Sequence, residues 1–212
     1  MQMLVIGATR GIGLACLRRA VADGHQVRAY ARSAAALSQE SPLVEPVAAD
    51  ALDGEALAAA LEGVDAVIQA TGLPINRATL TRPVDFHSRS TAVMLEAMGA
   101  AGIRRLVSVT GFGAGSSRGA MSLLERTGHD LILGRIYADK TRQEALIEES
   151  ALDWTIARAT ILTNGKAKGR YKVLTDAAKW RNGLISRADV ADFMVRAAAE
   201  GTYLRETPVI TY

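Results

Sequence analysis

The chain has 212 residues, of which 49% are hydrophobic and 22% charged, a composition typical of a globular protein and not of a disordered one. Aromatic residues make up only 5%, which argues against a nucleic-acid binder that works by base stacking. The net charge of +3 is too small for a strongly basic nucleic-acid or membrane surface, although it is compatible with an anionic ligand.

Short apolar runs alternate with helical patterns along the whole chain. Strands are expected at residues 3–8, 25–32, 43–50, 64–72, 104–111 and 153–160, and helices at 12–23, 53–63, 84–102, roughly 130–150 and 187–200. A glycine- and serine-rich loop is expected over 111–122. Short strands and loops follow residue 163, with a last extended piece over 207–211. This alternation predicts an α/β fold, a doubly wound parallel sheet with helices on both faces. No repeat or linker interrupts it, so residues 1–212 are expected to form a single domain whose irregular C-terminal segment forms a pocket wall.

The first strand and the first helix are joined by the glycine-rich turn GATRGIG, residues 7–13. The start of a helix carries unpaired N–H groups and a positive dipole end, which suit the pyrophosphate of a dinucleotide. Gly7 is expected to permit the tight turn, Gly11 to let the backbone approach phosphate, and Gly13 to let helix and strand pack closely. The alternative is an ordinary tight turn. The other residues of this turn in the predicted cofactor site are Thr9, Arg10 and Ile12.

The end of the second strand indicates which dinucleotide is bound. Sites specific for NAD usually carry an acidic residue there for the ribose hydroxyls. This chain instead reads AYARS over 29–33, with Arg32 and Ser33 in that place. A guanidinium suits a 2′-phosphate, and Arg10 is expected near the same adenosine end. Either arginine alone could be a solvated surface charge, but together they favour NADPH.

Two further strand ends are expected beside the cofactor. Asp50 ends the third expected strand, where its carboxylate could accept from the adenine amino group or cap the following turn, and the next residue, Ala51, is also predicted to bind the cofactor. The fourth expected strand ends with Ala70, Thr71 and Gly72. Ligands of such sheets bind outside the carboxyl ends of the strands, so these residues are predicted to line the cofactor site.

Several segments, taken in order, resemble a known family. They are IGATRGIG (6–13), AYARS (29–33), AAGIRRLVSVTG (100–111), DKTRQEALIEESALDWTIARAT (139–160), GRYKV (169–173) and ISRADVADFMVRAA (185–198). The chain resembles the atypical short-chain dehydrogenase/reductases, in the branch of biliverdin-IXβ reductase/NADPH-flavin reductase and NmrA. The resemblance implies a Rossmann fold and an NAD(P)H cofactor. Two departures are Arg10, where this branch often has the second glycine of GATGxxG, and Ala159, where many relatives have proline after Arg158.

The resemblance also bears on catalysis. Conventional members use a serine or threonine together with a tyrosine and a lysine four residues apart on one helix, the tyrosine handling the proton. Here Tyr137 and Lys140 are three residues apart. The match of Lys140 and Glu144 to the family's lysine and glutamate implies that Lys140 lies at the nicotinamide ribose. Tyr137 is then either a proton donor or a structural residue.

The hydroxyl position of the family is matched by Thr110, in SVTG, which is expected on the nicotinamide side. The next position, a serine in some relatives, is Gly111, and Ser108 is expected to face the sheet. This incomplete set for proton transfer favours an acceptor that takes its proton from water over a ketone. We therefore expect an NADPH-dependent oxidoreductase that transfers hydride to a flat conjugated acceptor such as a flavin, quinone or tetrapyrrole. Two alternatives stay open, a non-catalytic NADP(H)-binding redox sensor of the NmrA type and a specialised ketoreductase or isomerase that uses Tyr137.

The remaining candidate residues have mostly structural interpretations. His87 is expected on a helix surface, with the pocket entrance as the alternative, and His25 and His129 are expected to be solvated. Cys16 is expected in the core. Trp180 either walls the substrate pocket or packs, and loop 111–122 is a candidate lid. No cluster has metal-ligand spacing.

The single cysteine excludes an internal disulfide and suits a reducing compartment. No targeting pattern and no apolar run near the roughly 20 residues of a membrane span is present, so a cytoplasmic protein is expected. The expected partner is a small aromatic or conjugated molecule, without nucleic acid or membrane. The expected oligomeric state is a monomer or a weak homodimer.

Overall fold

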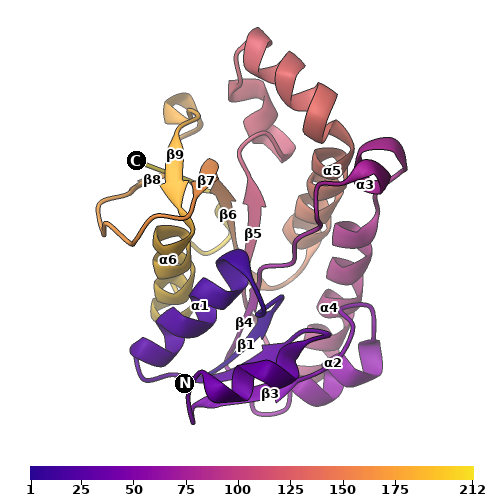
Figure 1. Ribbon diagram of the computed structural model, residues 1–212, viewed down its shortest axis with the longest axis vertical. Helices are drawn as coiled ribbons and strands as arrows, with labels where there is room; N and C mark the ends of the chain where they lie inside the picture. The colour runs from indigo at the N-terminus through magenta and orange to yellow at the C-terminus, as the bar shows by residue number, and fades with distance from the viewer.

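The apolar runs of the sequence form the strands of one mostly parallel sheet in the computed structural model, which describes all residues 1–212 (Figure 1). In spatial order these strands are β3 (Val44–Val47), β2 (Gln26–Tyr30), β1 (Gln2–Ile6), β4 (Ala66–Gln69), β5 (Arg105–Gly111), β6 (Asp153–Ala159), β10 (Val209–Thr211) and β8 (Lys172–Leu174). Neighbouring strands run parallel except β8, which is antiparallel to β10. A separate parallel pair joins β7 (Ile161–Thr163) and β9 (Leu184–Ser186).

Helices cover both faces of the sheet. One face carries α1 (Gly11–Ala22) and α6 (Arg187–Glu200), and the other carries α2 (Gly54–Ala60), α4 (Phe86–Ala101) and α5 (Leu123–Glu149) (Figure 1). Alternate residues of a strand point to opposite faces. Accordingly, Met3 and Val5 of β1 belong to the core under α1 and α6, whereas Leu4 and Ile6 belong to the core under α2 and α4. The predicted doubly wound α/β fold is confirmed.

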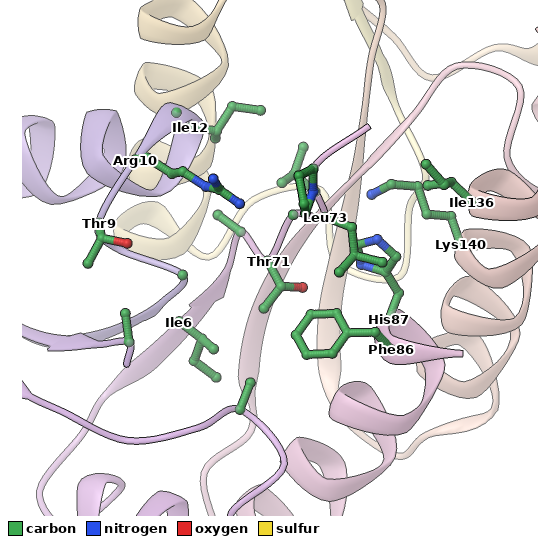
Figure 2. A pocket seen from close by; sticks show the side chains of 18 of the residues that line it. Ile6, Thr9, Arg10, Ile12, Thr71, Leu73, Phe86, His87, Ile136 and Lys140 are labelled. Carbon is green, nitrogen blue, oxygen red and sulfur yellow. The ribbon is translucent and has the colours of Figure 1, made fainter. Parts of the chain in front are cut away.

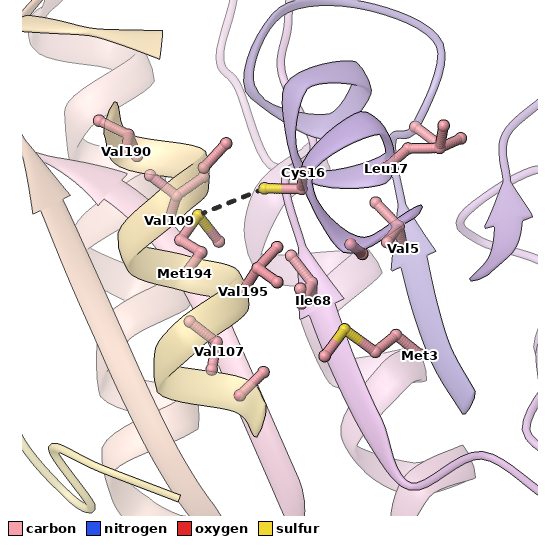
Figure 3. Close-up of a cluster of buried hydrophobic side chains, with 14 of the residues drawn as sticks. Met3, Val5, Cys16, Leu17, Ile68, Val107, Val109, Val190, Met194 and Val195 are labelled. Atoms are coloured by element: carbon pink, nitrogen blue, oxygen red, sulfur yellow. Dashed lines mark hydrogen bonds between the residues drawn. The ribbon is translucent and has the colours of Figure 1, made fainter. Parts of the chain in front are cut away.

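The core under α1 and α6 also settles the place of Cys16. Figure 3 shows Cys16 facing Met194 across the two helices, with 4.0 Å between the sulfur atoms. The thiol is fully buried, which raises its pKa. The prediction that Cys16 is a core residue is confirmed, because its side chain packs between helices without facing a ligand pocket.

The strand order reverses at β1. From β1 the chain proceeds to β2 and β3 on one side, and then returns to β4 on the other. In sheets of this kind the loops after the two strands at the reversal diverge and leave a crevice at their carboxyl ends. The glycine turn after β1 and the segment after β4 therefore meet at one place, although they are about sixty residues apart in the chain.

Some boundaries differ from the sequence-based expectation. Helix α5 begins at Leu123 and not near residue 130, because Ser122 and Glu125 form a capping box in which the Ser122 Oγ accepts from the Glu125 N–H and the Glu125 carboxylate accepts from the Ser122 N–H. The preceding loop contains a 3₁₀ helix, η2 (Gly115–Ala120). A short helix that the sequence did not suggest, α3 (Arg77–Thr81), follows β4 and is capped by Asn76.

Candidate cofactor and substrate site

One cavity of about 800 Å³ lies along the carboxyl ends of the central strands (Figure 2). It brings together almost all residues that the sequence assigned to the cofactor and to catalysis. Those that line it are Gly7, Thr9, Arg10, Gly11, Ile12, Arg32, Ser33, Asp50, Ala51, Ala70, Thr71, Gly72, Thr110, Tyr137 and Lys140. Gly13 does not line it, because it packs against the backbone of Gly7.

The glycines of the turn are required by backbone contacts. Gly7 has a φ of +87°, and a Cβ there would stand 2.6 Å from the carbonyl oxygen of Ala70 on the neighbouring strand end. A Cβ on Gly13 would collide with the carbonyl oxygen of Gly7. Gly11 has a φ of +59°, a backbone conformation that favours glycine. Gly7 and Gly13 therefore serve the close packing of strand, turn and helix, whereas Gly11 serves the backbone conformation of the turn.

The start of α1 is free to bind an anion. Arg10 is the N-cap residue but makes no capping hydrogen bond with its side chain. The N–H groups of Gly11, Ile12 and Gly13 have no acceptor in the protein. Unpaired N–H groups at the positive end of a helix dipole are the arrangement that binds phosphate groups. The chain thus fits the pyrophosphate of a dinucleotide at this turn.

A further guanidinium, that of Arg187, lies beside the same turn. Arg187 is the first residue of α6 and lines the cavity, and its Nε would be 3.9 Å from a Cβ placed on Gly11. Its Nη1 donates to Asn164 Oδ1 at 2.7 Å. Sequence reasoning missed this residue, although it lies in the segment ISRADVADFMVRAA. Only the packing of α6 against α1 brings it to the glycine turn.

Arg10, Arg32 and Ser33, predicted to lie at the adenosine of the cofactor, all line the cavity. The third strand ends at Val47, so Asp50 lies in the turn beyond it and not at the strand end. Its Oδ1 accepts from the Leu52 N–H at 3.0 Å, which realises the turn-capping alternative, and the residue also lines the cavity.

At the other end of the cavity, the Thr110 hydroxyl donates to Glu144 Oε1 at 2.5 Å. Glu144 also accepts from Arg158, at 2.8 Å to Nη2 and 3.2 Å to Nε, and both charged side chains are buried. The Thr110 proton is therefore directed away from the cavity. Ser108 is buried nearby, where it donates to Gln69 Oε1, and does not line the cavity.

The tyrosine and lysine of α5 meet different surroundings. The Tyr137 hydroxyl lies against Gly111, where any Cβ would collide with it. Burial and the nearby Glu144 carboxylate raise the pKa of Tyr137 to about 12. Burial lowers the pKa of Lys140 to about 8, against the opposing effect of Glu144 and Asp139. Position 111, a serine in some relatives, is glycine here, and the space of the missing side chain is occupied by the Tyr137 ring and hydroxyl.

Two histidines are placed differently from the sequence-based expectation. His87 was expected on a helix surface, with the pocket entrance as the alternative; it is 1% exposed and lines the cavity, which is closer to the alternative. The reason is that Asp139 of α5 accepts from the His87 N–H at 2.7 Å and so draws the start of α4 under α5. His129 was expected to be solvated, but it packs edge-on against Tyr137 with 4.1 Å between ring centroids, because α5 starts earlier than expected.

The last two candidates lie outside the cavity. His25 is half-buried in the turn before β2. Trp180 packs without lining the cavity, since its Nε1 donates to the Leu174 carbonyl at 2.9 Å and its ring lies 4.9 Å from the Arg158 guanidinium carbon.

No group of three or more His, Cys, Asp or Glu side chains could hold a metal ion. None of the helices combines the length and the apolar character needed to span a membrane.

Solved structures share this fold over the whole chain. ChuY, an anaerobillin reductase from Escherichia coli O157:H7, has a TM-score of 0.83 at 24% identity, with 100% of this chain and 97% of that chain covered. The oxidoreductase ylbE of Lactococcus lactis has a TM-score of 0.82 at 20% identity, covering 100% and 90%. A short-chain dehydrogenase/reductase from Veillonella parvula, solved with NADP, has a TM-score of 0.79 at 16% identity, covering 100% and 94%. At these identities the likeness shows the fold.

A curated relative is the photosystem II assembly factor Ycf39 of Synechocystis, 27% identical over 222 aligned positions. The match covers 99% of this chain but spans only 62% of the relative's length. The profile of the NAD(P)H-binding family matches residues 7–201, which include the glycine turn and α6. This match confirms the NAD(P)H cofactor that the glycine turn predicted. The chain belongs to the NAD(P)H-binding family.

Proposed function

We propose that this protein is an NADPH-dependent reductase that transfers hydride to a flat conjugated acceptor. The observation that carries the proposal is a single cavity that joins the glycine turn to the group of Thr110, Tyr137 and Lys140. When bound, the dinucleotide supplies the hydride at its nicotinamide. The protein's contribution is to hold the nicotinamide and the acceptor in contact, in the relative orientation that hydride transfer requires.

The cofactor end of the proposal rests on charge. The unpaired N–H groups at the start of α1 would bind the pyrophosphate, and Arg10 and Arg32 would bind the 2′-phosphate. The ammonium group of Lys140 would orient the nicotinamide ribose. Asp50 is the one carboxylate among the lining residues, and one of its oxygens is already used by its own turn. This balance of charge supports a phosphate-rich ligand.

The acceptor end of the proposal rests on shape and proton chemistry. Among the residues that line the cavity are the apolar side chains of Leu73, Pro74, Ile75, Phe86, Leu133, Ile136 and Leu162. Tyr137 has a raised pKa, and the Thr110 proton is held by Glu144. A flavin, quinone or tetrapyrrole needs no acid in place because it can take its proton from water. The anaerobillin reductase activity of ChuY, which shares the fold, supports an acceptor of this kind.

Steady-state oxidation of NADPH with FMN, dichloroindophenol and small quinones tests this function. We expect turnover with at least one of these acceptors. Absence of turnover with all of them would overturn the proposal. If the protein then bound NADP⁺ and NADPH with clearly different affinities, the result would instead favour a redox sensor of the NmrA type.

The cofactor preference is tested by binding measurements on Arg10→Ala and Arg32→Ala. Loss of a hydrogen bond to a charged group costs about 1.5–3 kcal/mol, so the Kd for NADPH should rise about 10- to 100-fold, whereas the Kd for NADH should stay within about two-fold. Arg18→Ala is a matched control, because Arg18 is an exposed arginine of α1 that pairs with Glu40 and does not line the cavity. Unchanged NADPH affinity in both Arg10→Ala and Arg32→Ala would contradict the assignment.

A further inference from the structure

His87 is a buried polar side chain that faces the acceptor end of the cavity without a protein partner. It is 1% exposed, and neither Nδ1 nor Nε2 has a hydrogen-bond partner. A buried polar group without a partner costs folding free energy, and such groups are rare in native proteins. The ring therefore reduces stability where it stands, which is typical of a side chain kept for binding.

The place of the His87 ring is fixed by the helix that carries Lys140. Asp139 precedes Lys140 on α5, and its carboxylate accepts from the His87 N–H at 2.7 Å and from the Ser88 hydroxyl at 2.6 Å. These bonds tie the start of α4 to α5. Figure 2 shows His87 rising from α4 below Leu73, on the side of the cavity from which the Lys140 side chain enters. His87 and Lys140 therefore both line the cavity, from two helices that these bonds join.

The surroundings keep this imidazole uncharged. Burial, and then the charge of Lys140, lower the pKa of His87 to about 3. The Phe86 ring stands edge-on to the His87 ring, with 5.7 Å between the ring centroids. The Asp139 carboxylate accepts from the backbone N–H of His87 and not from its ring. A neutral imidazole donates at one nitrogen and accepts at the other. Because neither ring nitrogen has a partner in the protein, the nitrogen that carries the proton has its N–H free for a ligand.

We propose that His87 is a further active-site residue, whose N–H binds the heteroatom of the acceptor that gains negative charge on reduction. The inference rests on the proposed reductase function. In the step, the acceptor takes a hydride with its electron pair from the reduced nicotinamide, which is oxidised by two electrons. A new bond to hydrogen forms on the acceptor and a π pair moves to its heteroatom, a nitrogen or an oxygen. The N–H of His87 stabilises that charge, and water supplies the proton.

The test compares His87→Phe and His87→Leu, which remove the donor, with His87→Gln, which keeps one. In both apolar variants we expect kcat/KM for the acceptor to fall about 10- to 100-fold, with the NADP⁺ Kd within about two-fold of wild type. The glutamine variant should recover part of the loss. The apolar variants should also unfold at a higher temperature, because a buried unpartnered group is removed. His25→Gln, remote from the cavity, is the matched control and should change neither quantity.

A spectroscopic measurement adds a readout that does not depend on turnover. The chain has three histidines, so the ¹⁵N signals of His87 are assigned by their loss in His87→Phe. We expect a neutral ring from pH 8 down to about pH 5, and a shift of the ring N–H signal when oxidised FMN is added to the complex with NADP⁺.

The outcomes separate the two proposals. If wild-type protein reduces none of the acceptors, the reductase function is overturned, and the role of His87 with it. If wild-type protein turns over and both apolar variants keep its kcat/KM, only the role of His87 is overturned. A lower unfolding temperature in both apolar variants, or an imidazolium ring at pH 7, would equally overturn it, because His87 would then be a structural or a charged residue.

Discussion

The buried ion pair between Arg158 and Glu144 allows a quantitative prediction about stability. The two side chains are 0% and 1% exposed, and the guanidinium also donates to Ser116 Oγ at 3.1 Å. We consider Arg158→Met, which keeps an apolar stem of similar length and removes the charge. The Glu144 carboxylate then stays buried, with the Thr110 hydroxyl as its remaining hydrogen-bond partner.

The magnitude follows from what the substitution leaves behind. A buried charge that loses its partner destabilises a protein by about 3–5 kcal/mol. For a chain of this length each kcal/mol lowers the melting temperature by about 2–4 °C, so the expected drop is roughly 6–20 °C. Adding Glu144→Gln removes the uncompensated charge while its amide oxygen can still accept from Thr110. The double variant should therefore recover most of the lost stability.

Urea unfolding followed by circular dichroism measures both effects. Far-ultraviolet detection is preferable to tryptophan fluorescence, because Trp180 lies against the Arg158 guanidinium and its signal would change with the substitution itself. A loss below about 1 kcal/mol in Arg158→Met would refute the reasoning. So would a double variant no more stable than the single one, since the destabilisation would then not come from an unpaired Glu144.

Three further predictions concern the cavity. Gly13→Ala should destabilise the protein by about 1–3 kcal/mol and weaken NADP⁺ binding, because its Cβ would meet the Gly7 carbonyl; an unchanged melting temperature would contradict this. Burial lowers the pKa of Lys140 from 10.5 to about 8, so the unfolded chain binds more protons between these values and wild-type stability gains with pH there. Lys140→Met lacks this gain, and its stability relative to wild type should therefore decrease from pH 8 to 10 in urea titrations; a constant difference would exclude the shift. Tyr137→Phe should keep acceptor reduction within about three-fold, because the hydroxyl packs against Gly111 and its raised pKa makes it a weaker acid, whereas a loss of two orders of magnitude would identify Tyr137 as an acid and favour a ketoreductase.

Much of the fold was predictable because its signals are local. The helix over Arg187–Glu200 was predicted at its observed bounds, since apolar residues recur at helical spacing and Gly201 ends the helix in a left-handed conformation. The start of α5 was missed although its signal, Ser122 followed by Glu125, is equally local. The glycines in that loop suggested an irregular segment that continued further than it does.

Part of the candidate site was likewise predictable from local sequence signals. The place of the glycine turn and of Arg32 at the cavity was predicted from sequence, because both follow neighbouring parallel strands at the same edge of the sheet. By itself the sequence thus determined the fold class, the cofactor family and the place of the glycine turn.

Only the tertiary structure decided which distant side chains meet. His87 is buried through Asp139, 52 positions away, and the Thr110 hydroxyl donates a hydrogen bond to Glu144, 34 positions away. Arg187 reaches the glycine turn because α6 packs beside α1. No periodicity or motif encodes such pairs, since they depend on how two helices are set against the sheet and on which side chains the remaining space admits.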